Sequence, residues 1–319
     1  MPEVTVLLAS YNPRIEKLKT CLKSVMLQRD ISTQIVITDD GSRDNQFDKI
    51  EAFFGKYGYT DYKLIANDEN RGTVKNMISG LSYCTGDYIK PISPDDYLYG
   101  EYALRHMVSY ADKQKADAVM CGSVYYCDDN GFKLLSSKAL PQHPEVYKKS
   151  RLIKRYYCLF EDRGLGVSFI IKSEKYREYM RMIEDKVIYA EDTAYKIMAA
   201  CDCRIDYLPE NCILYEYGHG ISTSGDCKWE ERIMADYRAA DEIIYARAKD
   251  VKFIDKYKAI KESDEKKTIL LKIKKYIKVP EFLPFVIRLK LQKNPRMTSS
   301  EYKREYLDKL FNSKLNQEE

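Results

Sequence analysis

Three pairs of acidic residues recur along the chain, each following a segment that is predicted to be a strand or turn ahead of a helix. The pairs are Asp39-Asp40, Asp95-Asp96 and Glu191-Asp192. Carboxylate oxygens are the ligands that hard divalent cations prefer, and a positioned carboxylate can act as a general base. Gathered around one cleft, these acids could hold a metal-bound, phosphate-bearing substrate and accept the proton of an attacking hydroxyl.

The first two pairs follow short apolar runs that are typical of buried strands. Residues 34–37 read Gln-Ile-Val-Ile, and residues 88–92 read Tyr-Ile-Lys-Pro-Ile before the turn at Ser93-Pro94. In an open α/β sheet, ligands bind in the crevice beyond the carboxyl ends of the strands. We therefore expect the acids at 39–40 and 95–96 to face the same cleft.

Strand-like and helix-like segments alternate through the first half of the chain. Predicted strands cover 4–8, 33–38, 62–66, 88–92 and 118–125, and predicted helices cover 14–28, 45–57, 73–84 and 101–114. This spacing predicts an α/β fold, with a mostly parallel central sheet flanked by helices on both faces. The pattern is less regular after residue 126, where we expect a hairpin turn at 127–131, a helix at 147–160 and strands at 167–171, 204–208 and 213–217.

Composition indicates a folded protein without a nucleic-acid partner. Hydrophobic residues make up 45% of the 319 residues, and 53 basic residues nearly balance 49 acidic ones. The amino terminus lacks the basic region of a signal peptide, and no apolar stretch approaches the ~20 residues of a membrane span. Nine cysteines without a C-x-x-C repeat are consistent with reduced thiols. We therefore expect a cytoplasmic protein.

A basic amphipathic helix is predicted at 267–278, followed by a second apolar cluster between Pro280 and Leu291. One interpretation is a helical appendage that packs on the rest of the protein and exposes its lysine face to solvent. The other is a peripheral contact with an anionic membrane at the inner face, to which each basic residue would add about 1 kcal/mol.

Five short motifs follow one another at the ends of the predicted elements. They are Ala9-Ser10-Tyr11-Asn12, Asp39-Asp40-Gly41-Ser42, Asn70-Arg71-Gly72 with Lys75-Asn76, Gly86-Asp87-Tyr88-Ile89 leading to Asp95-Asp96, and Glu191-Asp192. In this order they resemble the family 2 glycosyltransferases, which are inverting enzymes of the GT-A fold that use nucleotide-diphospho-sugars. The resemblance implies a catalytic domain over 1–225, with donor binding at about 1–126 and the acceptor side at about 127–225, and a basic helical extension over 226–319.

The resemblance implies that Ser10, Tyr11 and Asn12 belong to the donor site. Tyr11 would stack on the base, and Asp39 would accept a hydrogen bond from a ring N–H, which favours uracil over cytosine. Asp40 would approach the same pocket; its structural alternative is an Asx bond to the turn near Ser42. Tyr11 could instead be a core aromatic.

Lys75 and Asp95 would complete the donor contacts. Lys75 would contact the nucleotide or its phosphates as a compact point charge, or it is simply solvated. Asp95 would reach the ribose or the donor sugar. Ser222 and Thr223, in the glycine-rich segment 215–224, would donate hydrogen bonds to the pyrophosphate.

Asp96 matches the last acid of the family's metal-binding motif, which implies Mn²⁺ or Mg²⁺ as cofactor. His219 is a second candidate metal or phosphate contact, although a lone histidine on a loop is more often idle. The sequence departs from the family at Ser93, where a further acid is common, so diphosphate and water would complete the metal site. In the structural alternative, Asp95 and Asp96 cap the helix that is predicted to begin near Glu101.

Asp192 is the candidate general base, and Glu191 beside it would orient or bind the acceptor. The alternative is that Asp192 only caps the helix predicted at 193–200. These roles imply a hexosyl- or N-acetylhexosaminyltransferase that moves a sugar, probably from a UDP-sugar, to a glycan or lipid-linked acceptor in surface polysaccharide synthesis.

Two rival functions use the same kind of fold. A dinucleotide-dependent oxidoreductase would need a glycine-rich fingerprint after the first strand, but Ser10-Tyr11-Asn12-Pro13 contains no glycine. A non-catalytic nucleotide-sugar or glycan-binding protein on a degenerate transferase scaffold is the second rival, and it is harder to exclude because the further acid is missing at Ser93.

Overall fold

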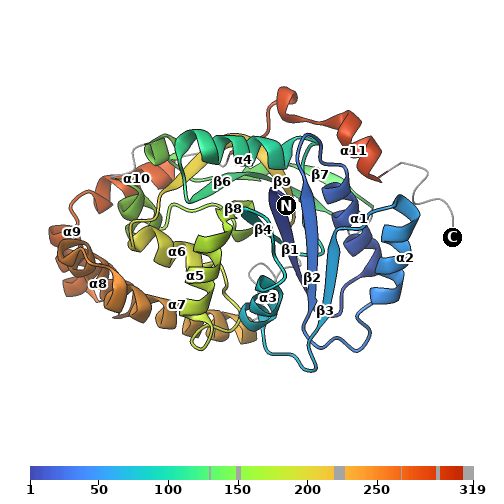
Figure 1. Ribbon diagram of the computed structural model, residues 1–319. Coiled ribbons are helices and arrows are strands. Elements are labelled where there is room, and N and C mark those ends of the chain that lie inside the picture. Colours follow the sequence, from blue (N-terminus) through green and yellow to red (C-terminus); the bar gives the residue numbers. More distant parts are fainter. Residues whose placement is uncertain (129–130, 149–151, 219–226, 267, 292–294, 312–319) are drawn as a thin grey trace.

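The computed structural model describes residues 1–128, 131–148, 152–218, 227–266, 268–291 and 295–311. Within these residues a single sheet of nine strands runs through the molecule, with helices on both of its faces (Figure 1). The strands are β1 (Val4–Ser10), β2 (Thr33–Asp39), β3 (Tyr62–Ala66), β4 (Tyr88–Ile92), β5 (Tyr97–Leu98), β6 (Ala118–Cys127), β7 (Lys133–Ala139), β8 (Phe169–Lys172) and β9 (Ile205–Glu216). The α-helices are α1 (Ile15–Met26), α2 (Phe47–Tyr57), α3 (Thr73–Leu81), α4 (Ala103–Gln114), α5 (Ser173–Ile183), α6 (Thr193–Ala200), α7 (Cys227–Arg247), α8 (Val251–Lys266), α9 (Ile269–Lys278), α10 (Phe282–Leu291) and α11 (Arg304–Phe311).

The sheet order is β3-β2-β1-β4-β8-β6-β9-β5, with β7 paired to β6. The first four strands are parallel neighbours, and β6 and β9 are parallel to each other. Strand β8 is antiparallel to both β4 and β6, so β4 and β6 run in the same direction. The predicted mostly parallel α/β sheet is confirmed.

The first strands are apolar along most of their length because both faces of the sheet are covered. In β1, Val4, Val6 and Leu8 enter one buried cluster while Leu7 enters the other. Alternate side chains of a strand point to opposite faces, so the two cores meet across the sheet. Because β1 to β4 are paired in parallel, their carboxyl ends lie at one edge of the sheet.

Three predicted elements, one helix and two strands, differ from the structure. The helix expected at 147–160 is a 3-10 helix, η1 (Pro144–Lys148), and a π-helix, η3 (Lys154–Leu159). The two strands expected at 204–208 and 213–217 are the single strand β9, whose pairing with β6 shifts register around Gly122. Pro209 lies in this irregular part, where a residue without an N–H group is tolerated because the ladder is locally interrupted.

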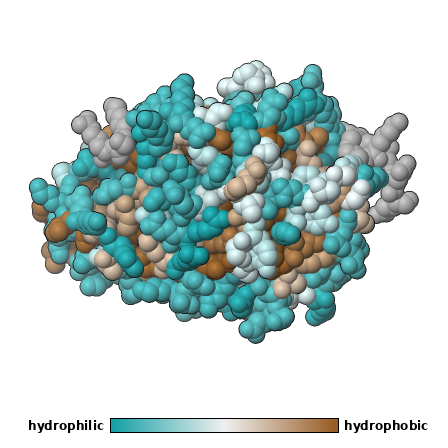
Figure 2. All heavy atoms as spheres, in the orientation of Figure 1, coloured by the Kyte–Doolittle hydropathy of each residue, from teal (hydrophilic) through white to brown (hydrophobic). Residues whose placement is uncertain are grey.

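Helices α8 to α10 lie at one end of the molecule, and α7 runs along the lower edge of the view from the middle towards that end; hydrophobic atoms reach the surface where α9 lies (Figures 1 and 2). The chain then returns to the first helices. Tyr306 and Leu310 of α11 are buried, and the Tyr306 hydroxyl donates to the Leu98 carbonyl at 2.8 Å. None of the helices in the described ranges is long and apolar enough to cross a bilayer.

Candidate active site

A cavity of about 940 Å³ lies beyond the carboxyl ends of β1 and β4. Its lining includes Tyr11, Asp40, Asp96, Glu191 and Asp192, which come from four of the five sequence motifs. The third motif also reaches the cavity through its asparagines and glycine. The crossover connections of a parallel sheet return each strand to the same edge, which is why motifs so far apart in the sequence share one hollow.

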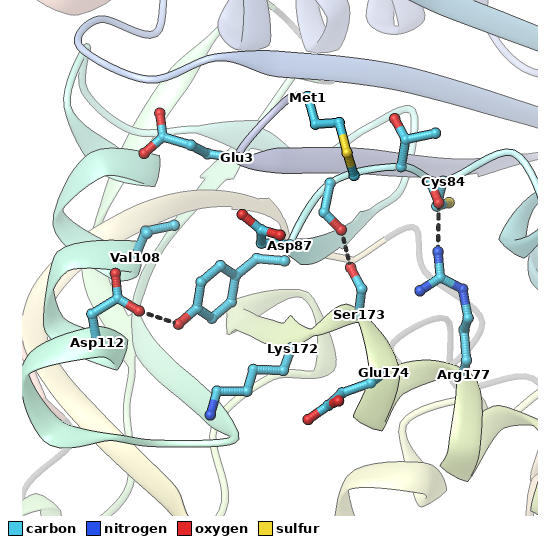
Figure 3. Close-up of a pocket in the computed structure, with 13 residues that line it drawn as sticks. Met1, Glu3, Cys84, Asp87, Val108, Asp112, Lys172, Ser173, Glu174 and Arg177 are labelled. Carbon is cyan, nitrogen blue, oxygen red and sulfur yellow. Dashed lines mark hydrogen bonds between the residues drawn. The ribbon is translucent and has the colours of Figure 1, made fainter.

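A second hollow, of about 640 Å³, lies at the opposite edge of the sheet, where β1 and β4 begin. Some of its polar side chains are bonded to one another or to backbone: the Tyr88 hydroxyl donates to Asp112 at 2.6 Å, and Arg177 donates to the Cys84 carbonyl at 2.5 Å (Figure 3). Because ligands of such sheets bind beyond the carboxyl ends of the strands, the larger cavity is the candidate site.

The turn around Tyr11 is held by several hydrogen bonds, and the tyrosine side chain is accessible. Tyr11 lines the cavity and is 54% exposed, so it is not a core aromatic. Asp39 is buried behind it and accepts hydrogen bonds from the Ser42 N–H at 2.8 Å and the Ser42 hydroxyl at 2.6 Å. Ser10 donates to Asp39 at 3.3 Å, and the Asn12 N–H donates to the Ser42 hydroxyl at 2.6 Å. The Asx bond considered for Asp40 is therefore made by Asp39.

Asp40 lines the cavity near Tyr11 and binds the segment at Arg71 and Gly72. That segment in turn contacts Ile188, close to the third acidic pair. It accepts hydrogen bonds from the N–H groups of Arg71 at 3.0 Å and Gly72 at 2.9 Å. Burial raises the pKa of Asp40, and these two bonds oppose the rise. Gly72 has φ +88°, and a Cβ on it would lie 2.4 Å from Cγ2 of Ile188, so only glycine fits. Next in the chain, the Val74 N–H donates to the Ile188 carbonyl at 3.0 Å.

Lys75 does not line this cavity. Its side chain is 43% exposed, and its ammonium lies 3.6 Å from the exposed carboxylate of Asp185. The structure thus favours the solvated alternative for this lysine in the conformation described. Ser222, Thr223 and His219 lie outside the described residues.

Asp95 and Asp96 point into the cavity from the turn after β4. Asp96 is only 4% exposed, and burial together with the neighbouring Asp95 raises its pKa well above the ordinary value. A hydrogen bond from the Glu216 N–H at 3.4 Å opposes this rise. Helix α4 begins at Ala103 and has its N-cap at Tyr102, so the alternative in which the acidic pair caps this helix does not hold.

The two carboxylates suit a divalent cation whose remaining ligands are water and substrate oxygens. Over the described ranges, no group of three or more His, Cys, Asp or Glu side chains is placed to hold a metal ion. Mg²⁺ and related ions are commonly bound through one or two carboxylates plus substrate phosphates and water. Burial is the main cause of the raised pKa values of Asp95 and Asp96; the charge of Glu216 raises that of Asp95 further and the charge of Asp95 raises that of Asp96, and a cation would relieve this repulsion. The donor set therefore suits Mg²⁺ or Mn²⁺ bound together with a diphosphate.

Glu191 and Asp192 stand at the beginning of α6. Asp192 occupies the N-cap position, but its side chain makes no capping hydrogen bond, so the cap-only alternative is not supported. Burial raises the pKa of both carboxyls; Asp192 further raises that of Glu191, while Arg163 and Lys196 lower that of Asp192. Gly166 lies against Asp192, where a Cβ would be 3.0 Å from the Asp192 Cβ.

Helix α7 supplies site residues that the sequence motifs did not reveal. Trp229, Arg232 and Tyr237 line the cavity, so the site draws on both sides of the predicted boundary at residue 225. Asp236 is 4% exposed and accepts three backbone hydrogen bonds, from the N–H groups of residue 188 at 2.9 Å, residue 189 at 2.7 Å and residue 190 at 2.9 Å. This carboxylate holds the turn immediately before Glu191. In the sequence, Asp236 is one of many charged residues on a helix, and no local signal distinguishes it.

We expect Asp236→Asn to lower kcat by about 10- to 100-fold, because small misplacements of reacting groups have effects of that size. The charge of Asp236 also contributes to the raised pKa of Glu191, so any limb of the pH–rate profile that Glu191 sets should move to lower pH. Steady-state kinetics across pH tests this, with Glu231→Gln, an exposed carboxylate of α7, as the matched control. Loss of activity in step with loss of thermal stability, with an unmoved pH profile, would mean that Asp236 only stabilises the fold.

Comparison with known proteins agrees with this geometry. Residues 5–181, more than half of the chain, match the family described as Glycosyl transferase family 2. The putative glycosyltransferase EpsH of Bacillus subtilis (strain 168) is 28% identical over 169 residues, or 53% of this chain and 46% of EpsH. The dTDP-rhamnosyl transferase RfbG of Shigella flexneri is 27% identical over 175 residues, or 54% of this chain and 56% of RfbG. The chain thus spans about half the length of these relatives.

Solved structures of transferases share the fold. S. aureus TarS 1-349 in complex with UDP-GlcNAc superposes with a TM-score of 0.56 at 15% identity, covering 88% of this chain and 80% of that one. The mannosyltransferase PcManGT from Pyrobaculum calidifontis, in complex with GDP-Man and Mn²⁺, gives 0.52 at 15% identity, covering 92% and 81%. At this identity the likeness concerns the fold, which is the GT-A fold.

Proposed function

Because the chain belongs to glycosyl transferase family 2, we propose that it transfers a sugar from a nucleoside diphosphate to a hydroxyl of a glycan or lipid-linked acceptor, with inversion at the anomeric carbon. The observation that supports this most directly is the shared cavity, which has Asp96 on one wall and Asp192 on another. A setting in surface polysaccharide synthesis is part of the same proposal.

The donor nucleotide is assigned to the Tyr11 side of the cavity. Tyr11 offers an exposed aromatic face for stacking on a base. Asp39 is 1% exposed, does not line the cavity and accepts hydrogen bonds from Ser10 and Ser42, whereas Asp40 lines the cavity directly. A carboxylate here can accept a hydrogen bond from a ring N–H of the base. Uracil and thymine have such a group and cytosine does not. The donor is therefore proposed to be a UDP-sugar, with a dTDP-sugar as the second choice because of the likeness to RfbG.

The reaction is derived from the carboxylates of this chain. The acceptor oxygen forms a bond to the anomeric carbon as the bond from that carbon to the diphosphate oxygen breaks, and the acceptor proton passes to Asp192. Arg163 stabilises the ionised form of Asp192, and Glu191 would orient the acceptor. When bound at Asp95 and Asp96, Mn²⁺ or Mg²⁺ supplies positive charge for the leaving diphosphate. Asp95 would also approach the donor sugar.

A thermal-shift panel of nucleoside diphosphates tests the donor assignment. UDP at 100 times its dissociation constant without metal should stabilise the protein by about 2.7 kcal/mol, and the same UDP concentration should stabilise it more when Mn²⁺ is added. GDP, CDP and dTDP complete the panel, and Tyr11→Ala should remove most of the shift. Stabilisation by NAD with none from any nucleoside diphosphate would overturn the proposal.

The non-catalytic rival is tested by turnover. A transferase should hydrolyse its nucleotide-sugar donor slowly in the absence of acceptor, and a binder should not. If the parent chain releases UDP from UDP-sugars no faster than Asp192→Asn does, the protein is a binder. The loss of activity would then be explained by Ser93, which stands where the family often has an acid.

A further inference from the structure

Helix α9 presents its aliphatic side chains to solvent. Ile269 and Leu270 are each 75% exposed, Ile273 is 52% exposed and Ile277 is 74% exposed. Residues three and four positions apart share a face of a helix, so these four side chains form one continuous outward stripe. The usual orientation of an amphipathic surface helix, with the apolar stripe towards the core, is reversed here.

The inward face of α9 carries lysines. Lys275 is buried and lies 2.6 Å from the carboxylate of Asp264 on α8, and Lys278 lies 2.5 Å from that of Asp255. Lys275 also stands over the ring of Phe282, 4.1 Å from its centroid. These contacts fix the rotation of α9. They place Lys275 and Lys278, and not the aliphatic stripe, against α8.

Helix α10 repeats the arrangement. Leu283, Ile287 and Leu291 are 46%, 50% and 80% exposed and lie on one side at a spacing of four residues. Phe285 points the other way and stacks on Phe160, with ring centroids 4.4 Å apart. We call the seven exposed residues of the two helices the α9–α10 aliphatic face. Figure 2 shows hydrophobic atoms at the edge of the molecule where α9 lies.

The basic residues of α9 and α10 indicate which kind of surface would bind this face. The segments 269–278 and 282–291 contain six basic residues and no Asp or Glu. Lys272 and Lys274 flank the stripe on α9, and Arg288 and Lys290 flank the stripe on α10. Two copies of the chain meeting through this face would bring these cations against one another. An anionic surface would instead pair with them while the aliphatic groups leave water.

We propose that the α9–α10 aliphatic face binds an anionic phospholipid bilayer, with its aliphatic side chains in the acyl boundary and the flanking cations among the lipid phosphates. The binding needs neither nucleotide nor metal, so it stands apart from the proposed transfer reaction. If that reaction uses a lipid-linked acceptor, this surface would hold the enzyme where the acceptor lies.

Flotation of the full chain with lipid vesicles tests the proposal. The protein should float with phosphatidylcholine vesicles that contain 30% phosphatidylglycerol and remain largely free with phosphatidylcholine alone. Ile273→Ser with Ile277→Ser should lower the partition coefficient at least tenfold. Val251→Ser, which alters a side chain that is 79% exposed on α8, is the matched control and should bind as the parent does. A separate variant, Lys272→Gln with Lys290→Gln, should weaken binding more at low salt than at high salt.

Three outcomes would overturn the proposal. One is no flotation of the parent chain with the anionic vesicles, and another is equal flotation of the parent and the Ile273/Ile277 variant. The third is a parent that is dimeric by analytical ultracentrifugation and a variant that is monomeric, with no vesicle binding by either, which would assign the face to a second copy. UDP binding measured on the same samples shows that the donor site is intact, so failure of the two proposals can be told apart.

Discussion

Asp192→Asn is expected to lower kcat for sugar transfer by about 10²- to 10⁴-fold, the range typical for loss of a general base. The amide cannot accept the acceptor's proton, but it has nearly the same shape, and Asp192 makes no capping bond that the fold would lose. Affinity for UDP should stay within about twofold, because the nucleotide is assigned to another wall of the cavity. Initial rates with a UDP-sugar and calorimetric UDP binding measure the two quantities separately.

The same residue predicts the pH dependence. A general base works only when it is deprotonated, and burial holds the pKa of Asp192 above its ordinary value of about 4. Activity should therefore be present above this raised pKa and be lost as the pH falls through it, at a higher pH than a solvent-exposed aspartate would give. Rate profiles of the parent enzyme would show this limb.

Asp202→Asn is the matched control for Asp192→Asn. Asp202 is also an aspartate next to α6, its side chain is 69% exposed, and its φ of +67° is one that asparagine tolerates. This variant should keep the parent rate. Retention of more than half of the parent kcat by Asp192→Asn would remove Asp192 from the reaction.

Asp96→Asn is expected to abolish the effect of metal on nucleotide binding and to lower transfer by at least about 100-fold, since a bound metal contributes several kcal/mol of charge stabilisation. The substitution replaces an anionic oxygen ligand with a neutral one at a buried position. Calorimetric titration of UDP with and without Mn²⁺ measures the metal effect directly. In the parent, Mn²⁺ should tighten UDP binding.

Ser93→Asp is the informative companion to Asp96→Asn. Ser93 is exposed on the same turn and stands where the resembling family often has a further acid. Adding a carboxylate there should preserve or strengthen the Mn²⁺-dependent binding of UDP. If Asp96→Asn binds UDP with an unchanged response to Mn²⁺, the metal is held elsewhere and the assignment of Asp96 fails.

Much of the fold could be read from local pattern. Apart from the short strand β5, the strands and helices of the first half agree with the prediction to within a few residues, because alternation in a strand and the 3.6-residue period of a helix are visible over a short stretch. The motifs containing Tyr11, Asp40, Asp96 and Asp192 could be expected to converge, because parallel strands bring their carboxyl ends to one edge. The structure of segment 147–160, which was expected to be a helix, was harder to predict, because its 3-10 and π turns depend on what they pack against.

The sequence by itself determined the alternation of elements, the order of the acidic motifs and which residues share a helix face. Only the tertiary structure decided that Asp39 and not Asp40 bonds to Ser42, that Asp236 holds a turn 48 positions earlier in the chain, and that α9 turns its aliphatic stripe outward. The physical reason is the same in each case. A period in the sequence specifies which side chains lie on one face, but the partner that a face or a carboxylate meets is set by contacts between elements that are distant in the chain.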